Sequence, residues 1–164
     1  MRYLTDEEPE SLRRKVDIFK TRAKDLRRWG KLQEHERELV GLIQSLDSKY
    51  PNLLVVVEGK RDVRVLENLG VQAPIIKTQS RLSRIAVAEK IAAKAGNAGQ
   101  VLILTDFDKE GKEICKFIEK ELELSGVKVL KRERRMIRKQ MGPWRCIEEI
   151  VSLFKRSDSP EASR

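Results

Sequence analysis

Hydrophobic positions in the first third of the chain recur at helical spacing. Two segments each place their apolar residues on one helical face: Leu12, Val16 and Phe19 in the first, and Leu39, Leu42, Ile43 and Leu46 in the second. Gly30 lies between the two segments and is expected to break the periodicity. The pattern predicts an α-helical hairpin from Pro9 to Lys49.

After Pro51 the apolar residues come in short runs that alternate with helical periodicity, which is typical of βαβ units and a parallel sheet. The runs at 53–57 and 101–104 are apolar at every position, so we expect them to be central strands with helices on both faces. Shorter strands are predicted at 73–78 and, at an edge, at 127–130. Helices are predicted from Ser80 to about Ala95, from Gly111 to Leu124, and from Pro143 onward, the last burying Trp144, Ile147, Ile150 and Val151.

Length and composition favour one compact domain with an appendage over two full domains, because one core needs roughly 100 to 150 residues and the chain has 164, with 40% hydrophobic content. We therefore expect a helical hairpin over 1–50, an α/β domain over 51–131 and a basic helical segment over 132–155. The tail, 156–164, has nothing to bury and is predicted to be disordered.

Positive charge dominates the chain, with 35 Lys and Arg against 26 Asp and Glu and a formal net charge of +9. This surplus favours a polyanionic partner, with nucleic acid as the leading candidate. The basic residues concentrate between Ser11 and Lys31 and between Lys128 and Lys139. Each stretch is either a solvated helix face or a surface that contacts phosphate.

Other classes of function find little support in the sequence. Cys115, Cys146 and the single His35 lack the spacing of zinc ligands, and the apolar runs are too short to cross a bilayer. We expect a cytoplasmic protein that does not bind membranes.

Acidic residues follow both predicted central strands. Asp106 and Asp108 lie at the end of the second, Glu110 enters the next helix, and Glu58 ends the first strand. Because the carboxyl ends of neighbouring parallel strands lie about 4.8 Å apart, we expect these four acids to share one crevice. Such a cluster must bind protons, basic side chains or a cation, and oxygen ligands alone select Mg²⁺ or Mn²⁺.

Alternative roles exist for several of these residues. Asp108 or Glu110 could cap the helix that begins near Gly111. Lys60 and Arg61 could form salt bridges with the acids, or they could receive a phosphate at the start of the first crossover helix.

The stretches "VVVEGKRDVRVLENLG" (55–70) and "VLILTDFDKEGKEI" (101–114) resemble the Toprim domain. This domain is shared by type IA topoisomerases, bacterial-type primases, ribosomal-RNA maturation nucleases and overcoming-lysogenization-defect nucleases. The likeness covers about 51–131 and is greatest to a small stand-alone archaeal Toprim protein. It implies an α/β, Rossmann-like fold with a four-stranded parallel sheet in the order 2-1-3-4.

The resemblance also implies roles for the matched residues. Glu58 corresponds to the acid that exchanges a proton with the reacting oxygen or helps to hold metal, and Asp106 and Asp108 correspond to Mg²⁺ ligands. Glu110 matches a third acid found in the topoisomerase version. Strand passage is not expected, because the only tyrosines are Tyr3 and Tyr50 and the chain is too short for a DNA gate. Primase activity is not expected without a preceding zinc module.

The leading hypothesis is a Mg²⁺-dependent enzyme that acts on phosphodiester bonds of RNA or DNA, most simply by hydrolysis. Gly59 and Gly111 would let phosphate approach the backbone, and the predicted nucleic-acid contacts are Lys60, Arg61, Arg132, Arg134, Arg135, Arg138 and Lys139. One alternative is a non-catalytic Toprim module that binds nucleic acid within a larger processing complex. Another is a protein-partner role for the N-terminal helices.

Overall fold

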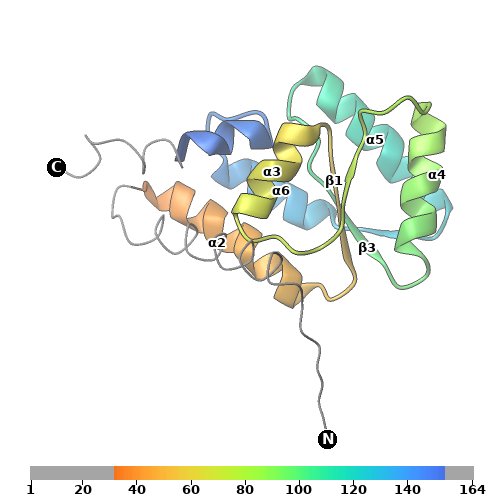
Figure 1. The fold of residues 1–164 in the computed structure, drawn as a ribbon, viewed down its shortest axis with the longest axis horizontal. Helices are drawn as coiled ribbons and strands as arrows, with labels where there is room; N and C mark the ends of the chain where they lie inside the picture. Colours follow the sequence, from red (N-terminus) through yellow and green to blue (C-terminus); the bar gives the residue numbers. More distant parts are fainter. Residues whose placement is uncertain (1–31, 154–164) are drawn as a thin grey trace, which may run out of the picture.

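The computed structural model describes residues 32–153. The first helix of the expected hairpin and the 156–164 tail lie outside these residues. A four-stranded parallel sheet forms the centre, in the order β2-β1-β3-β4 (Figure 1). Its strands are β1 (Leu53–Val57), β2 (Ile75–Lys77), β3 (Gln100–Ile103) and β4 (Lys128–Val129). The predicted strand order is confirmed.

Helices cover both faces of this sheet. One face packs against α2 (Glu34–Lys49), α3 (Lys60–Asn68), α6 (Lys131–Gln140) and the short 3₁₀-helix η1 (Ile147–Ile150). The other packs against α4 (Arg84–Ala95) and α5 (Lys109–Leu124). Figure 1 shows these two groups of helices on opposite sides of β1 and β3. None of the helices within 32–153 is long and apolar enough to cross a membrane.

The continuous apolar runs form the two central strands because each contributes to two cores. In β1, Leu53, Val55 and Val57 belong to the core under α2, α3 and α6, whereas Leu54 and Val56 belong to the core under α4 and α5. All five residues are buried. The alternation of side chains across a strand therefore explains why no polar position interrupts the run.

Most predicted helices occur close to their expected positions. The segment with Leu39 and Ile43 forms α2, and α4 ends at Gly96, whose φ of 62° favours glycine. The prediction of a helix starting at Pro143 is wrong. Residues 141–144 form a turn in which Trp144 N–H donates to Met141 O (3.2 Å), and helical structure begins only at Ile147.

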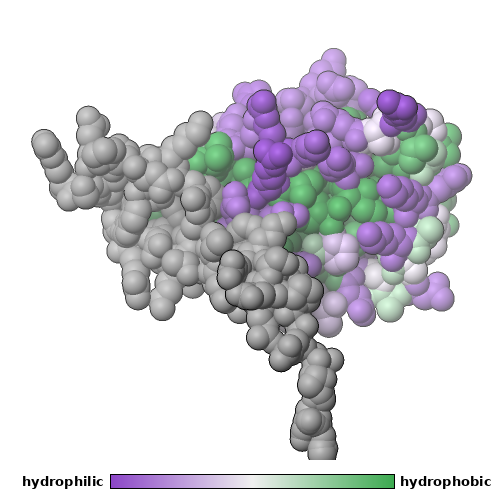
Figure 2. All heavy atoms as spheres, viewed as in Figure 1, coloured by the Kyte–Doolittle hydropathy of each residue, from purple (hydrophilic) through white to green (hydrophobic). Residues whose placement is uncertain are grey.

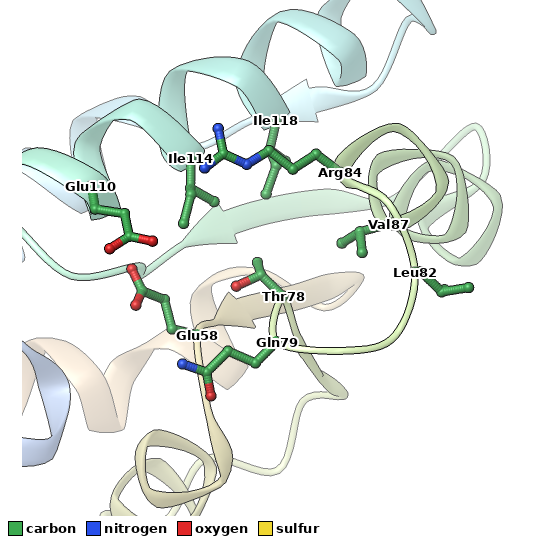
Figure 3. A pocket seen from close by; sticks show the side chains of 9 residues that line it. All are labelled: Glu58, Thr78, Gln79, Leu82, Arg84, Val87, Glu110, Ile114 and Ile118. Atoms are coloured by element: carbon green, nitrogen blue, oxygen red, sulfur yellow. The ribbon is translucent and has the colours of Figure 1, made fainter.

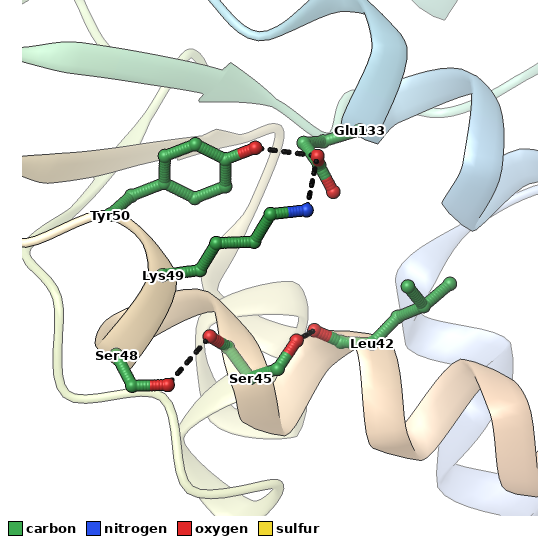
Figure 4. Close-up of polar contacts among 6 residues, drawn as sticks. All are labelled: Leu42, Ser45, Ser48, Lys49, Tyr50 and Glu133. Atoms are coloured by element: carbon green, nitrogen blue, oxygen red, sulfur yellow. Dashed lines mark hydrogen bonds and ion pairs between the residues drawn. The ribbon is translucent and has the colours of Figure 1, made fainter.

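The basic α6 is held against the rest of the domain by a buried acid. Glu133 is 4% exposed, and its Oε1 accepts hydrogen bonds from the Tyr50 hydroxyl (2.5 Å) and from Lys49 Nζ (3.1 Å) (Figure 4). These contacts join α6 to the end of α2.

On the face drawn in Figure 2, hydrophilic side chains are interspersed with apolar ones.

Candidate metal and nucleic-acid site

Glu58 and Asp106 meet at the carboxyl edge of the sheet. Glu58 directly follows β1, and its Oε1 accepts a hydrogen bond from the backbone N–H of Asp106 at 3.1 Å. Strict alternation would put Glu58 on the face of Val56 and Asp106 on the face of Leu104, on opposite sides of the sheet. They come together because both residues lie beyond the last paired positions of their strands, where the backbone leaves the sheet.

The turn into α5 brings the next acid to the same edge. Asp108 is the N-cap of α5, and its Oδ1 accepts a hydrogen bond from Gly111 N–H at 2.8 Å. The capping role considered for Asp108 is therefore present in the structure. Gly111 allows this close turn, because a Cβ at this position would lie 2.0 Å from Asp106 O. The function of Gly111 in phosphate approach stays a prediction, and the close packing against Asp106 O is enough to require a glycine here.

Glu110 lies in the first turn of α5 and faces Glu58. The two carboxylates point toward each other across the mouth of a small hollow of about 180 Å³ (Figure 3). The remaining walls combine polar and apolar side chains: Thr78, Gln79, Leu82, Arg84, Val87, Ile114 and Ile118. The acidic edge thus opens beside a pocket formed by α4, α5 and the segment after β2.

A further acid, Asp62, supports this edge from α3. Asp62 is buried, and its carboxylate accepts hydrogen bonds from Gly59 N–H (3.0 Å) and Glu148 N–H (3.1 Å). It fixes the start of α3 beside Glu58 and attaches η1 to the same place. Asp62 was not among the predicted site residues, although its position three residues after Gly59 is the usual place for an acid that caps a helix.

The crowding of acids at the edge raises the pKa values of Asp106 and Glu58. Burial and then the negative charges of Glu58, Asp62 and Asp108 raise the pKa of Asp106 to about 7. Burial also raises the pKa of Glu58; the Asp106 N–H counteracts this, and the charges of Asp108, Asp62 and Glu110 reinforce it. The edge therefore carries more negative charge than its surroundings neutralise, as a cation site would.

With this geometry established, comparison with known proteins identifies the family. Residues 53–140 match the Toprim domain. The chain belongs to the Toprim family. The Toprim domain is a metal-binding fold associated with nucleic-acid processing. The archaeal relatives described next confirm the expected likeness to a small stand-alone archaeal Toprim protein.

The relatives of this Toprim protein include UPF0292 proteins of archaea. The chain is 35% identical over 127 residues to one from Thermococcus sibiricus, covering 77% of this chain and 95% of the relative. It is 40% identical over 105 residues to one from Pyrococcus horikoshii, covering 62% and 74%. A match to one from Thermococcus onnurineus is 48% identical over 69 residues and spans 42% of this chain and about half, 48%, of that relative.

One solved structure has the same fold. A protein from Aquifex aeolicus superposes with a TM-score of 0.56 at 23% identity, covering 66% of this chain and 94% of that protein. At this identity, the likeness concerns the fold alone.

The acids at the edge of the Toprim domain have the ligand atoms that a hard cation prefers, but their side chains do not converge on one point. Glu58, Asp106 and Glu110 offer only carboxylate oxygens, which Mg²⁺ and Mn²⁺ prefer. Among residues 32–153, however, no three acidic, His or Cys side chains converge closely enough to hold a metal ion. Ligation therefore requires the carboxylates to rotate toward a common point.

The predicted nucleic-acid contacts lie in three different environments. Lys60 is exposed at the start of α3, and Arg61 pairs with Glu148 at 2.9 Å rather than with the acids of the edge. On α6, Arg132, Arg135 and Lys139 are exposed, whereas Arg138 donates to Gly142 O (3.0 Å).

Arg134 differs from the other predicted contacts. It is only 9% exposed, and its NH1 donates to Ile103 O (2.9 Å) and Thr105 O (3.0 Å). The side chain therefore extends beneath the surface and holds the end of β3. An outward-facing Arg on a basic helix and an inward-facing one look the same in the sequence run "KRERRMIRKQ".

Proposed function

We propose that this Toprim protein is a Mg²⁺-dependent enzyme that hydrolyses phosphodiester bonds of RNA or DNA. The observation that carries the proposal is the group of acids at the carboxyl edge of β1 and β3. None of these acids forms an ion pair within residues 32–153, and burial together with the charges of its acidic neighbours raises the pKa of Asp106 to about 7. Ligands of open parallel sheets bind at this edge. An acid cluster that is destabilised without a cation is expected of a metal site.

The proposed roles follow the positions of the side chains. Asp106, Asp108 and Glu110 would hold Mg²⁺ or Mn²⁺, which supplies charge neutralisation for the phosphoryl oxygens and orients water. Glu58 would exchange the proton of the reacting oxygen, because its raised pKa brings it nearer to neutral pH. Lys60, exposed at the N-terminus of α3, would contact a phosphate.

A second candidate is a non-catalytic nucleic-acid-binding module. It is favoured by the lack of a ready ligand set among residues 32–153. In that case the acids would still bind a cation weakly, but no bond would be cleaved.

Cleavage of labelled RNA and DNA strands, with Mg²⁺ or with a chelator, separates the two candidates. We expect Mg²⁺-dependent products from the native protein, and binding without products from Asp106→Asn. Strand binding without cleavage of any RNA or DNA tested would contradict the enzymatic proposal and leave the binding module. Cleavage by Asp106→Asn at the native rate would contradict the proposed role of the acids.

A further inference from the structure

A basic groove lies between α5 and α6, at the end of β3. Its volume is about 330 Å³, and six of its lining residues are positively charged: Lys112, Lys116, Lys131, Arg134, Arg135 and Arg138. Glu119 is its only acidic lining residue within 32–153. This groove does not share a lining residue with the hollow beside Glu58 and Glu110.

Arg134 and Phe107 form the floor of the groove. Arg134 is held by the carbonyls of Ile103 and Thr105, and its Cζ lies 4.3 Å from the centre of the Phe107 ring. Arg138 approaches the same ring at 5.4 Å. No carboxylate among residues 32–153 forms an ion pair with Arg134, so its charge is fixed beneath the groove without being neutralised by direct contact.

The rim of the groove carries cations that are free to bind a ligand. Lys112 and Lys116 are exposed and lie one helical turn apart on α5, and Arg135 is exposed on the facing side of α6. None of these three forms an ion pair within the described part of the chain. Lys131 differs, because it pairs with Glu123.

The lining chemistry selects the backbone of a nucleic acid rather than its bases. Lys and Arg side chains only donate hydrogen bonds, and phosphate oxygens only accept them. A base edge presents both donors and acceptors, and among the lining side chains of residues 32–153 Glu119 is the only carboxylate that could accept from it. Cys115 Sγ already donates to that carboxylate at 3.2 Å. Among residues 32–153, Phe107 is the only aromatic residue of the lining, and one ring is too few for a stacking platform.

One turn of the chain joins the groove to the acidic edge. Phe107 lies on the groove floor, and its sequence neighbours Asp106 and Asp108 belong to the acidic edge. A strand bound between α5 and α6 would therefore lie against the turn that carries these two acids.

We propose that the groove between α5 and α6 binds the sugar–phosphate backbone of the strand that is presented to the acidic edge. The identity of the acidic edge as the reacting site rests on the proposed function, but strand binding in the groove does not require cleavage. The contacts would be independent of sequence, since they involve phosphates alone.

The test is the double variant Lys112→Glu with Lys116→Glu, compared with Lys90→Glu with Lys94→Glu. The control pair lies one turn apart on exposed positions of α4 and changes the net charge equally. Labelled single strands of RNA and of DNA are titrated by fluorescence anisotropy in a chelator, over a series of salt concentrations. Binding without metal reports on the groove and not on cleavage.

We expect the α5 variant to bind at least about tenfold more weakly than the native protein, while the α4 variant stays within about threefold. The logarithm of the association constant falls with the logarithm of the salt concentration. The steepness of this dependence should be smaller by about 1.4 in the α5 variant, because two phosphate contacts to a single strand are lost. The RNA and DNA arms show which strand the groove accepts. If the charge reversal impairs folding, the double variant Lys112→Ala with Lys116→Ala replaces it, provided that its Tm equals that of the native protein.

Equal affinities and salt slopes for the α5 and α4 variants would overturn the inference, as would a native protein that binds neither strand. If the α5 variant loses binding but the native protein cleaves nothing in Mg²⁺, the groove is supported and the proposed enzymatic function fails. If the native protein cleaves and the α5 variant binds normally, the enzymatic function stands and the groove fails.

Discussion

The molecule places carboxylates in two contrasting environments. Glu133 is buried between α2 and α6, but Tyr50 and Lys49 both donate hydrogen bonds to it (Figure 4). Asp106 is partly buried beside Glu58, Asp62 and Asp108, and its partners are other acids. One acid is neutralised by its neighbours and the other is repelled by them.

The pKa shifts record this difference. Burial by itself would raise the pKa of Glu133, but the hydrogen bonds from Tyr50 and Lys49 and the charge of Lys49 lower it below the ordinary value. The pKa of Asp106 rises to about 7. A paired acid stabilises the fold, whereas a cluster of unpaired acids costs stability and is expected where a cation or a proton is to be bound.

The largest expected effect is on catalysis. Glu58→Gln should lower the rate of Mg²⁺-dependent strand cleavage by about 10²-fold or more, because it removes the proposed proton-exchanging group. Glu133→Gln makes the same chemical change in the paired environment and should leave the rate within about threefold of the native value. Comparable losses in both variants would mean that the acidic edge has no special role.

Cation binding should stabilise the folded protein through the acids of the edge and not through Glu133. At pH 8, Mg²⁺ or Mn²⁺ at about 100 times its Kd should add roughly 2.7 kcal/mol to the free energy of unfolding, seen as a rise in Tm. Asp106→Asn should lose most of this rise, and Glu133→Gln should keep it. A native Tm that does not respond to either ion, with substrate strand absent or present, would contradict the metal site.

Removal of the paired acid should destabilise the protein. Glu133→Gln weakens the hydrogen bonds from Lys49 and Tyr50, and the free energy of unfolding at pH 7 should fall by about 1–2 kcal/mol in urea denaturation. Because the pKa of Glu133 is lowered in the folded protein, its contribution is lost as the pH falls through that value. The difference between native and variant should therefore shrink in acid, and a constant difference would argue against the ion pair.

Removal of an unpaired acid should have the opposite and smallest effect. The pKa of Asp106 is about 7 in the folded protein and 3.8 ordinarily, so between these values the folded state holds a proton that the unfolded chain has lost. The stability contributed by Asp106 therefore falls as pH rises through this window. Without metal, Asp106→Asn should gain about 2–4 °C in Tm over the native protein at pH 8 and almost nothing at pH 4. Equal differences at both pH values would contradict the repulsion.

The site could be predicted where its residues follow a buried strand directly. Glu58, Asp106 and Asp108 come after continuous apolar runs, and parallel strands bring their carboxyl ends to one edge. The contact of Asp62 with η1 could not be predicted, because Glu148 N–H lies 86 positions away in the chain. Lys112 and Lys116 were missed because exposed lysines on an amphipathic helix give no local signal of a groove.

The sequence by itself determined the parallel sheet, its two central strands and the acids at their ends. These follow from short-range patterns, since a strand buried on both faces must be apolar throughout and polar groups can begin only where it ends. The tertiary structure alone decided which charges are paired and which are exposed. Glu133 and Arg134 are neighbours in a basic run, yet one anchors α6 to α2 and the other lies under Phe107. The environments of Glu133 and Arg134 depend on how α6 packs against distant elements. The order of charges along one helix therefore does not predict them.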